Sequence, residues 1–207
     1  MVDLSVDSLR TEWRKKLLHL DARGRVAFSS SCAQSLLPLR TEYGRMHKIH
    51  LVDLTKEMER LWACAATKEA FGAIDKLKRR FDAECPGFEE DGSIPTEMMT
   101  WALNAFENAV AVADTGGMEP CELAMWSAIE CAGLELTLRV PGARTTLSDE
   151  DFFSERELRA EYQRWESAYD ILEGRRLDFL GELRRLAQKW GDERLAAVRQ
   201  YGPASPA

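Results

Sequence analysis

Apolar residues recur at intervals of three and four along almost all of this 207-residue chain. This spacing marks one face of an α-helix, and no strand-like alternation of apolar and polar residues rises above it. The stripe Leu9, Trp13, Leu17 and Leu20 is an example. We therefore predict an all-α fold, a single helical bundle of about seven to nine helices. Because the connections are short, consecutive helices should be mostly antiparallel neighbours.

Helix ends are marked by proline, glycine and capping residues. Pro38 should close a helix that starts near Gly24, because proline cannot donate the next hydrogen bond of the helix. Thr96 is predicted as the N-cap of a helix that ends at Gly116-Gly117. The serine run Ser29–Ser31 lies inside an apparent helix and is interpreted as a place where helices pack closely.

The chain is expected to form one main domain with a C-terminal addition. Residues 1–174 are assigned to the all-α bundle, residues 175–201 to a helical extension packed on it, and residues 202–207 to a flexible tail. The extension should contain two helices, about 175–190 and 192–201. The two most apolar helices, near residues 98–112 and 123–138, are expected at the centre of the fold.

The cysteines and the apolar segments predict the compartment. An odd number of cysteines without close pairing favours free, mostly buried thiols and a cytoplasmic location. No secretory signal and no transmembrane helix is expected, because no apolar stretch is long enough and free of charge. The five cysteines are Cys32, Cys64, Cys85, Cys121 and Cys131. The six tryptophans are spread about one to a helix, which predicts core positions rather than a binding platform.

Negative charge is concentrated in the middle of the chain. Residues 82–157 carry 17 Asp or Glu and only 3 Lys or Arg, whereas the whole chain has a net charge of −7. Nucleic-acid binding needs a concentrated basic surface, so no nucleic-acid partner is expected. Two loops hold runs of acids that we predict as partner-binding residues: Glu89, Glu90 and Asp91 in one loop, and Asp149, Glu150 and Asp151 in the other.

No motif for catalysis, a cofactor or a metal is present, so none of the three is predicted. His47 and His50 stand three residues apart with Asp53 three further on, a spacing that could offer metal ligands. Surface histidines near a helix end are the favoured interpretation. Glu107 and Glu130 lie in the two most apolar helices and could form a paired-carboxylate site. The favoured alternative is that each faces the solvated edge of its helix.

Several stretches are similar to a bacterial family known as domain of unknown function 416, the YjaG-like proteins. The resemblance covers about residues 20–175 and lies in helical patterning rather than in an invariant motif. The chain departs from the family pattern around Tyr43–His50 and after Gly174. The resemblance implies an all-α bundle and assigns no catalytic residue. The stretches are Val26–Ser29, Leu36–Pro38, Glu59–Trp62, Ala73–Leu77, Asp91–Pro95 leading into Ala102–Ala113, and Glu157–Leu172.

Our leading hypothesis is a non-enzymatic protein-binding module of the immunity or antitoxin type. Its partner would be a cognate protein such as a toxin or effector domain, bound through an acidic surface that steers to a basic site. No membrane partner is expected, and a homodimer is possible. Two alternatives stay open. One is a helical-bundle enzyme that binds a metal or small ligand through Glu107, Glu130 or His47 and His50, and the other is a homo-oligomeric scaffold.

Overall fold

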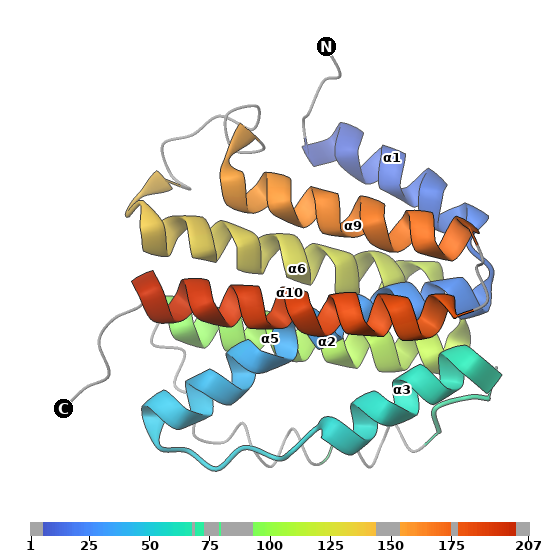
Figure 1. Ribbon diagram of the computed structural model, residues 1–207, viewed down its shortest axis with the longest axis horizontal. Coiled ribbons are helices and arrows are strands. Elements are labelled where there is room, and N and C mark those ends of the chain that lie inside the picture. Colours follow the sequence, from blue (N-terminus) through green and yellow to red (C-terminus); the bar gives the residue numbers. More distant parts are fainter. Residues whose placement is uncertain are drawn as a thin grey trace.

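The computed structural model describes residues 6–67, 69–72, 79, 93–143, 154–174 and 178–201. These residues form seven helices and no strand (Figure 1), which confirms the predicted all-α bundle. No helix among them is both long enough and apolar enough to cross a membrane. The helices are α1 (Val6–His19), α2 (Ala22–His47), α3 (Thr55–Thr67), α5 (Ile94–Thr115), α6 (Met118–Arg139), α9 (Arg156–Gly174) and α10 (Phe179–Tyr201).

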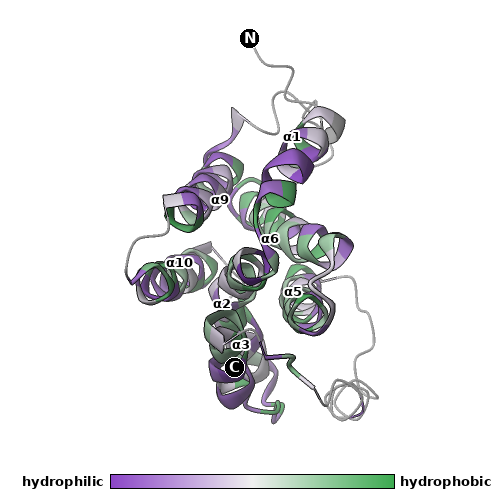
Figure 2. Ribbon diagram, turned by 90° about the vertical axis from the view of Figure 1, so that its right-hand side faces the viewer, coloured by the Kyte–Doolittle hydropathy of each residue, from purple (hydrophilic) through white to green (hydrophobic). Residues whose placement is uncertain are grey.

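Helix α2 lies in the middle of the bundle. Figure 2 shows it between α5 on one side and α10 on the other, with α3 and α6 also beside it. Its buried residues run from Gly24 to Gly44, and many of them are small. Small side chains let neighbouring helices approach, so a helix of low apolar content occupies the centre. The two apolar helices expected there are α5 and α6, and both pack on α2.

The buried serines of α2 support the packing interpretation of this segment. Ser29, Ser31 and Ser35 each donate a hydrogen bond to a carbonyl oxygen one turn earlier in the same helix, at 2.7–2.8 Å. A buried hydroxyl without an acceptor would destabilise the fold. Ser29, Ser31 and Ser35 therefore combine small size with internally satisfied polarity, which suits a helix surrounded by others, whereas the buried hydroxyl of Ser30 has no hydrogen-bond partner among the described residues.

The prediction that Pro38 ends its helix is wrong, because α2 continues through Pro38 to His47. Proline removes one intrahelical hydrogen bond and normally kinks or breaks a helix. Here the residues that follow are taken up into the core, since Leu39 and Tyr43 are buried. Burial of this last part of α2 offsets the missing hydrogen bond.

Helix α10 is also continuous where two helices were expected. Gly191 lies inside it and is buried. A Cβ atom at Gly191 would be 3.0 Å from Cγ of Pro38 and 3.3 Å from the carbonyl oxygen of Ser35. The glycine therefore serves the close approach of α10 to α2 and does not break the helix. Helix α10 packs against α2, α3, α6 and α9.

We expect Gly191→Leu to lower the free energy of unfolding by about 1–3 kcal/mol, because the added side chain has to push α10 away from the rigid Pro38 ring. Gly174→Leu is the matched control. Gly174 ends α9, and a Cβ atom there would have no neighbour within 4 Å. Urea denaturation followed by circular dichroism measures both variants. Equal stability of the two would show that the contact with Pro38 has no energetic consequence.

Helices α5 and α6 form a hairpin that turns at Gly116-Gly117, as predicted. Gly116 has φ +65°, in the left-handed region that glycine enters readily, and its N–H donates to the carbonyl of Val112 at 2.7 Å. The N-cap of α5 is Ser93, so the prediction of Thr96 is wrong. Thr96 lies one turn later and is buried, with its hydroxyl 3.5 Å from the hydroxyl of Tyr43 on α2.

An aromatic cluster attaches α1 to the bundle. Trp13 is completely buried, and its ring centroid lies 5.3 Å from that of Trp165 on α9 and 5.8 Å from that of Phe28 on α2. The contact with Trp165 is edge-to-face, with an interplanar angle of 78°, and contacts of this kind stabilise beyond the area that they bury. The prediction that the tryptophans are core residues is supported, since Trp13, Trp62, Trp165 and Trp190 are buried and Trp101 and Trp126 are partly buried.

Candidate functional site

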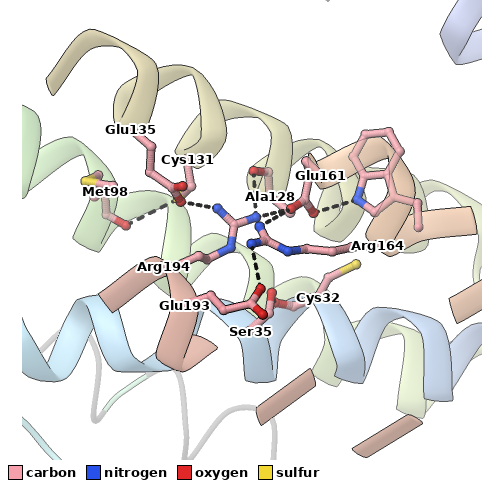
Figure 3. A network of polar contacts seen from close by, with 11 residues as sticks. Cys32, Ser35, Met98, Ala128, Cys131, Glu135, Glu161, Arg164, Glu193 and Arg194 are labelled. Atoms are coloured by element: carbon pink, nitrogen blue, oxygen red, sulfur yellow. Dashed lines mark hydrogen bonds and ion pairs between the residues drawn. The ribbon is translucent and has the colours of Figure 1, made fainter. Parts of the chain in front are cut away.

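A cluster of buried charges is centred on Arg194 of α10 (Figure 3). The Arg194 side chain is 0% exposed. Its Nη1 donates to Oε1 of Glu135 on α6, and its Nη2 donates to Oε2 of Glu161 on α9. Nη2 also donates to the carbonyl oxygen of Ala128 at 3.5 Å. One guanidinium therefore connects three helices in the core.

Glu161 accepts more hydrogen bonds than Glu135 in this cluster. Its Oε1 accepts a hydrogen bond from Nε1 of Trp165 at 2.8 Å, and its Oε2 accepts one from Nη1 of Arg164 at 3.1 Å. Arg164 in turn reaches Glu193 of α10 at 3.4 Å. Buried carboxylates are stable only when donors satisfy their oxygens. Both oxygens of Glu161 have such donors.

The electrostatics keep Arg194 charged. Burial disfavours the cation, but the carboxylates of Glu135 and Glu161 more than offset this, so the pKa of Arg194 is raised above its ordinary value. A guanidinium that stays protonated cannot transfer protons at neutral pH. The arrangement can hold α6, α9 and α10 in one register, because moving any of them would separate buried charges.

Three buried thiols lie in the core, Cys32 on α2 and Cys121 and Cys131 on α6. Burial raises the pKa of Cys121 to about 12, and it also raises the pKa values of Cys32 and Cys131. The thiolate is the nucleophilic form, so these groups are unreactive at neutral pH. Together with Cys64 they are free and buried, as predicted, whereas Cys85 lies outside the described residues.

A second cluster of charged side chains connects α10 with the last turns of α2. Glu42 is only 4% exposed and accepts hydrogen bonds from Arg45 at 3.0 Å and from Arg199 of α10 at 2.7 Å. The two guanidinium groups lower the pKa of Glu42 to about 2. Glu42 is therefore ionised throughout the physiological range, and this ion pair is insensitive to pH there.

Sequence reasoning missed Arg194, Glu135 and Glu161. The signal for two of them is a charge within an apolar stripe. Arg194 stands four residues after Trp190 and four before Val198, and both of these are buried. Glu161 likewise lies between buried neighbours on α9. A charge at such a position predicts burial with a partner, but which helix supplies the partner depends on the tertiary packing.

The six loop acids predicted to bind a partner lie outside the described residues. They are Glu89, Glu90, Asp91, Asp149, Glu150 and Asp151. The structure describes helices at the borders of both loops, since α5 begins at Ile94 and α6 ends at Arg139. The role of these acids stays a prediction.

The residues of the alternative metal and acid–base sites are at the surface. His47, His50 and Asp53 are exposed, at the end of α2 and in the segment after it. Glu107 and Glu130 are partly exposed, on α5 and α6. Within the described part of the chain, His, Cys, Asp and Glu side chains form no group of three or more that could hold a metal ion.

Helices α5 and α6 carry acids without any lysine or arginine from residue 93 to residue 138. The two helices lie side by side, and Figure 2 shows α5 across α2 from α10. We call this surface the α5–α6 acidic side. Its exposed or partly exposed acids are Glu97, Glu107, Asp114, Glu119, Glu122 and Glu130. Basic groups reach it from α1, where Nε of Arg14 is 3.2 Å from Oε1 of Glu122.

Comparison of the whole fold with solved structures finds a protein with a similar fold. The crystal structure of a DUF416 family protein from Shewanella baltica superposes with a TM-score of 0.71. The match covers 85% of this chain and 93% of that one, at 15% sequence identity. This chain has the DUF416 fold. The resemblance predicted from the sequence is thus confirmed at the level of the fold.

Comparisons of the amino-acid sequence find no match. No family model matches the chain, and no curated protein matches it. The fold is therefore shared at a low sequence identity. A shared fold does not carry a function, which has to be argued from the surface and the sites of this chain.

Proposed function

We propose that this chain is a non-enzymatic protein-binding module of the immunity or antitoxin type. It would neutralise a cognate toxin or effector domain by covering a basic site with the α5–α6 acidic side and the loops next to it. A toxin that acts on nucleic acid or nucleotides needs a basic site, and such a site is complementary to this surface.

The observation that carries the proposal is the absence of lysine and arginine on α5 and α6, from residue 93 to residue 138. Most surfaces interleave both signs of charge, and mixed charges cancel at a distance. Arg14 of α1 pairs with Glu122, but α5 and α6 themselves contribute no cation between residues 93 and 138. The side would therefore keep a negative field that accelerates the encounter with a basic partner. The predicted loop acids Glu89–Asp91 and Asp149–Asp151 would extend this field at the borders of the two helices.

The buried clusters support a rigid presentation of that surface. Arg194 holds α6 to α9 and α10, and Thr96 on α5 lies beside Tyr43 of the central helix. Binding costs less free energy when the surface is already ordered. A bundle with its helices fixed in register is therefore a suitable scaffold for tight recognition of one partner.

The test is binding to the protein encoded by the adjacent gene, measured by calorimetry and by stopped-flow association at two salt concentrations. We expect a complex that weakens as salt rises. The triple variant Glu97→Gln, Glu107→Gln and Glu130→Gln should lower the affinity by about tenfold, mostly through the association rate. Neutralising all six loop acids should add to this effect.

A matched control removes the same amount of charge elsewhere. Asp170→Asn, Glu173→Gln and Glu182→Gln change three acids on α9 and α10, away from the α5–α6 acidic side. This variant should bind as the natural chain does. The proposal fails if no complex forms with the neighbouring protein, or if both triple variants weaken binding equally.

A further inference from the structure

A hollow of about 520 Å³ lies between the last turns of α2 and the segment that leads into α3. In Figure 1 this segment runs along the lower edge of the molecule between the two helices. The volume is in the range of pockets that bind small molecules. The hollow is distinct from the α5–α6 acidic side, because no residue of α5 or α6 lines it.

The walls of the hollow are held in place by hydrogen bonds. Nη1 of the buried Arg40 donates to the carbonyl of Val52 at 2.8 Å, and the N–H of Ile49 donates to the carbonyl of Gly44 at 2.9 Å. A Cβ atom at Gly44 would lie 2.9 Å from Cδ1 of Leu51, so the glycine lets the segment approach α2 closely. The hollow is therefore preformed between a helix and a fixed segment.

The charge of the lining is opposite to that of the whole chain. Four groups that are cationic or can become so line it: Arg40, Arg45, Lys48 and His50. The acid of the lining is Asp53, which already accepts hydrogen bonds from the N–H of Thr55 at 2.9 Å and from its hydroxyl at 2.6 Å. Positive charge thus dominates at this place although the chain as a whole carries −7.

The remaining lining is mostly apolar and includes Leu37, Leu51 and Leu54, and it also contains Thr41 and Thr55. Cations beside an apolar wall match a ligand that has both kinds of surface. We propose that this hollow binds a small organic anion, a compact oxyanion attached to an apolar body. The oxyanion lies against Arg45, Lys48 and His50, and the apolar body lies along the leucines.

Arg45 has a shared role in this site. It pairs with Glu42, yet its side chain stays 56% exposed. A guanidinium has five N–H donors in a planar fork, so one edge can serve Glu42 while another serves an oxyanion. Because Arg199 also pairs with Glu42, the position of that carboxylate does not depend on Arg45 alone.

The experiment titrates the ¹⁵N-labelled chain with 4-phenylbutyrate and, separately, with 4-phenylbutylamine, which has the same apolar body and the opposite charge. We expect 4-phenylbutyrate to cause saturable amide shifts at Gly44 and from Lys48 to Thr55, and to lose affinity as salt rises. The amine should leave these amides unshifted.

Two variants locate the binding. Lys48→Gln with His50→Gln should weaken 4-phenylbutyrate by about fivefold. Thr41→Trp adds bulk at the exposed edge of the hollow and keeps every cation, and it should abolish binding. The matched control, Lys15→Gln with His19→Gln, removes the same groups from the exposed side of α1 and should bind normally.

The proposal is overturned if 4-phenylbutyrate causes no saturable shift at these amides. It is also overturned if the amine binds equally well, or if Thr41→Trp leaves binding unchanged. Because Thr41 is exposed and the paired Lys48 and His50 variant changes only surface groups, loss of folding does not confuse the result, and circular dichroism checks it. None of these outcomes depends on the α5–α6 acidic side.

Discussion

We expect Arg194→Met to lower the free energy of unfolding by about 3–5 kcal/mol, as measured by urea denaturation followed by circular dichroism. The guanidinium is fully buried and hydrogen bonded to Glu135 and Glu161. Methionine has a similar length but no charge, so the substitution leaves two buried carboxylates without their shared cation. Uncompensated buried charge is among the most destabilising changes that a single substitution can make.

The control is the same substitution at Arg184 on the same helix. Arg184 pairs with Glu59 at the surface, and both side chains are substantially exposed. Arg184→Met should change stability by less than about 1 kcal/mol. Adding Glu135→Gln and Glu161→Gln to Arg194→Met should recover part of the loss, since no uncompensated charge then remains. Equal costs at Arg194 and Arg184 would contradict the role assigned to the buried cluster.

We expect Trp13→Ala to lower the free energy of unfolding by about 3–5 kcal/mol, the cost of replacing a buried large aromatic residue with alanine. Trp13 contacts rings from two other helices, Phe28 on α2 and Trp165 on α9. Lys16 Nζ also lies 4.7 Å from the centre of its ring. The variant should unfold at a lower urea concentration, and the amides of α1 should lose hydrogen-exchange protection first.

Leu18→Ala is the control for this prediction. Leu18 lies on the same helix but is 61% exposed, so its removal should change stability by no more than about 0.5 kcal/mol. If α1 kept its hydrogen-exchange protection in Trp13→Ala, contacts other than the aromatic cluster would have to attach it to the bundle.

Helix positions and one turn were predictable from local patterns. The stripe of α1 was predicted because Leu9, Trp13, Leu17 and Leu20 share one face of any helix that they form, and all four are buried. The turn at Gly116 was predictable because a left-handed residue at a helix end strongly favours glycine. Such signals depend on a few consecutive residues, so no knowledge of the fold is needed.

Two of the errors arose where a distant helix overrides the local rule. Pro38 does not end α2 and Gly191 does not break α10, because these two residues pack against each other across the interface. Each would weaken its helix in isolation. Together they allow a close contact whose burial offsets the local cost, and this pairing can be recognised only when both helices are in place.

The sequence by itself determined an all-α bundle, its helical faces and the segregation of acids into the middle of the chain. The tertiary structure decided which helix lies at the centre, which residues meet around Arg194 and where the basic hollow forms beside α2. The reason is physical. Periodicity and charge order are properties of neighbouring residues, whereas a buried ion pair or a lined hollow joins groups from segments that only packing brings together.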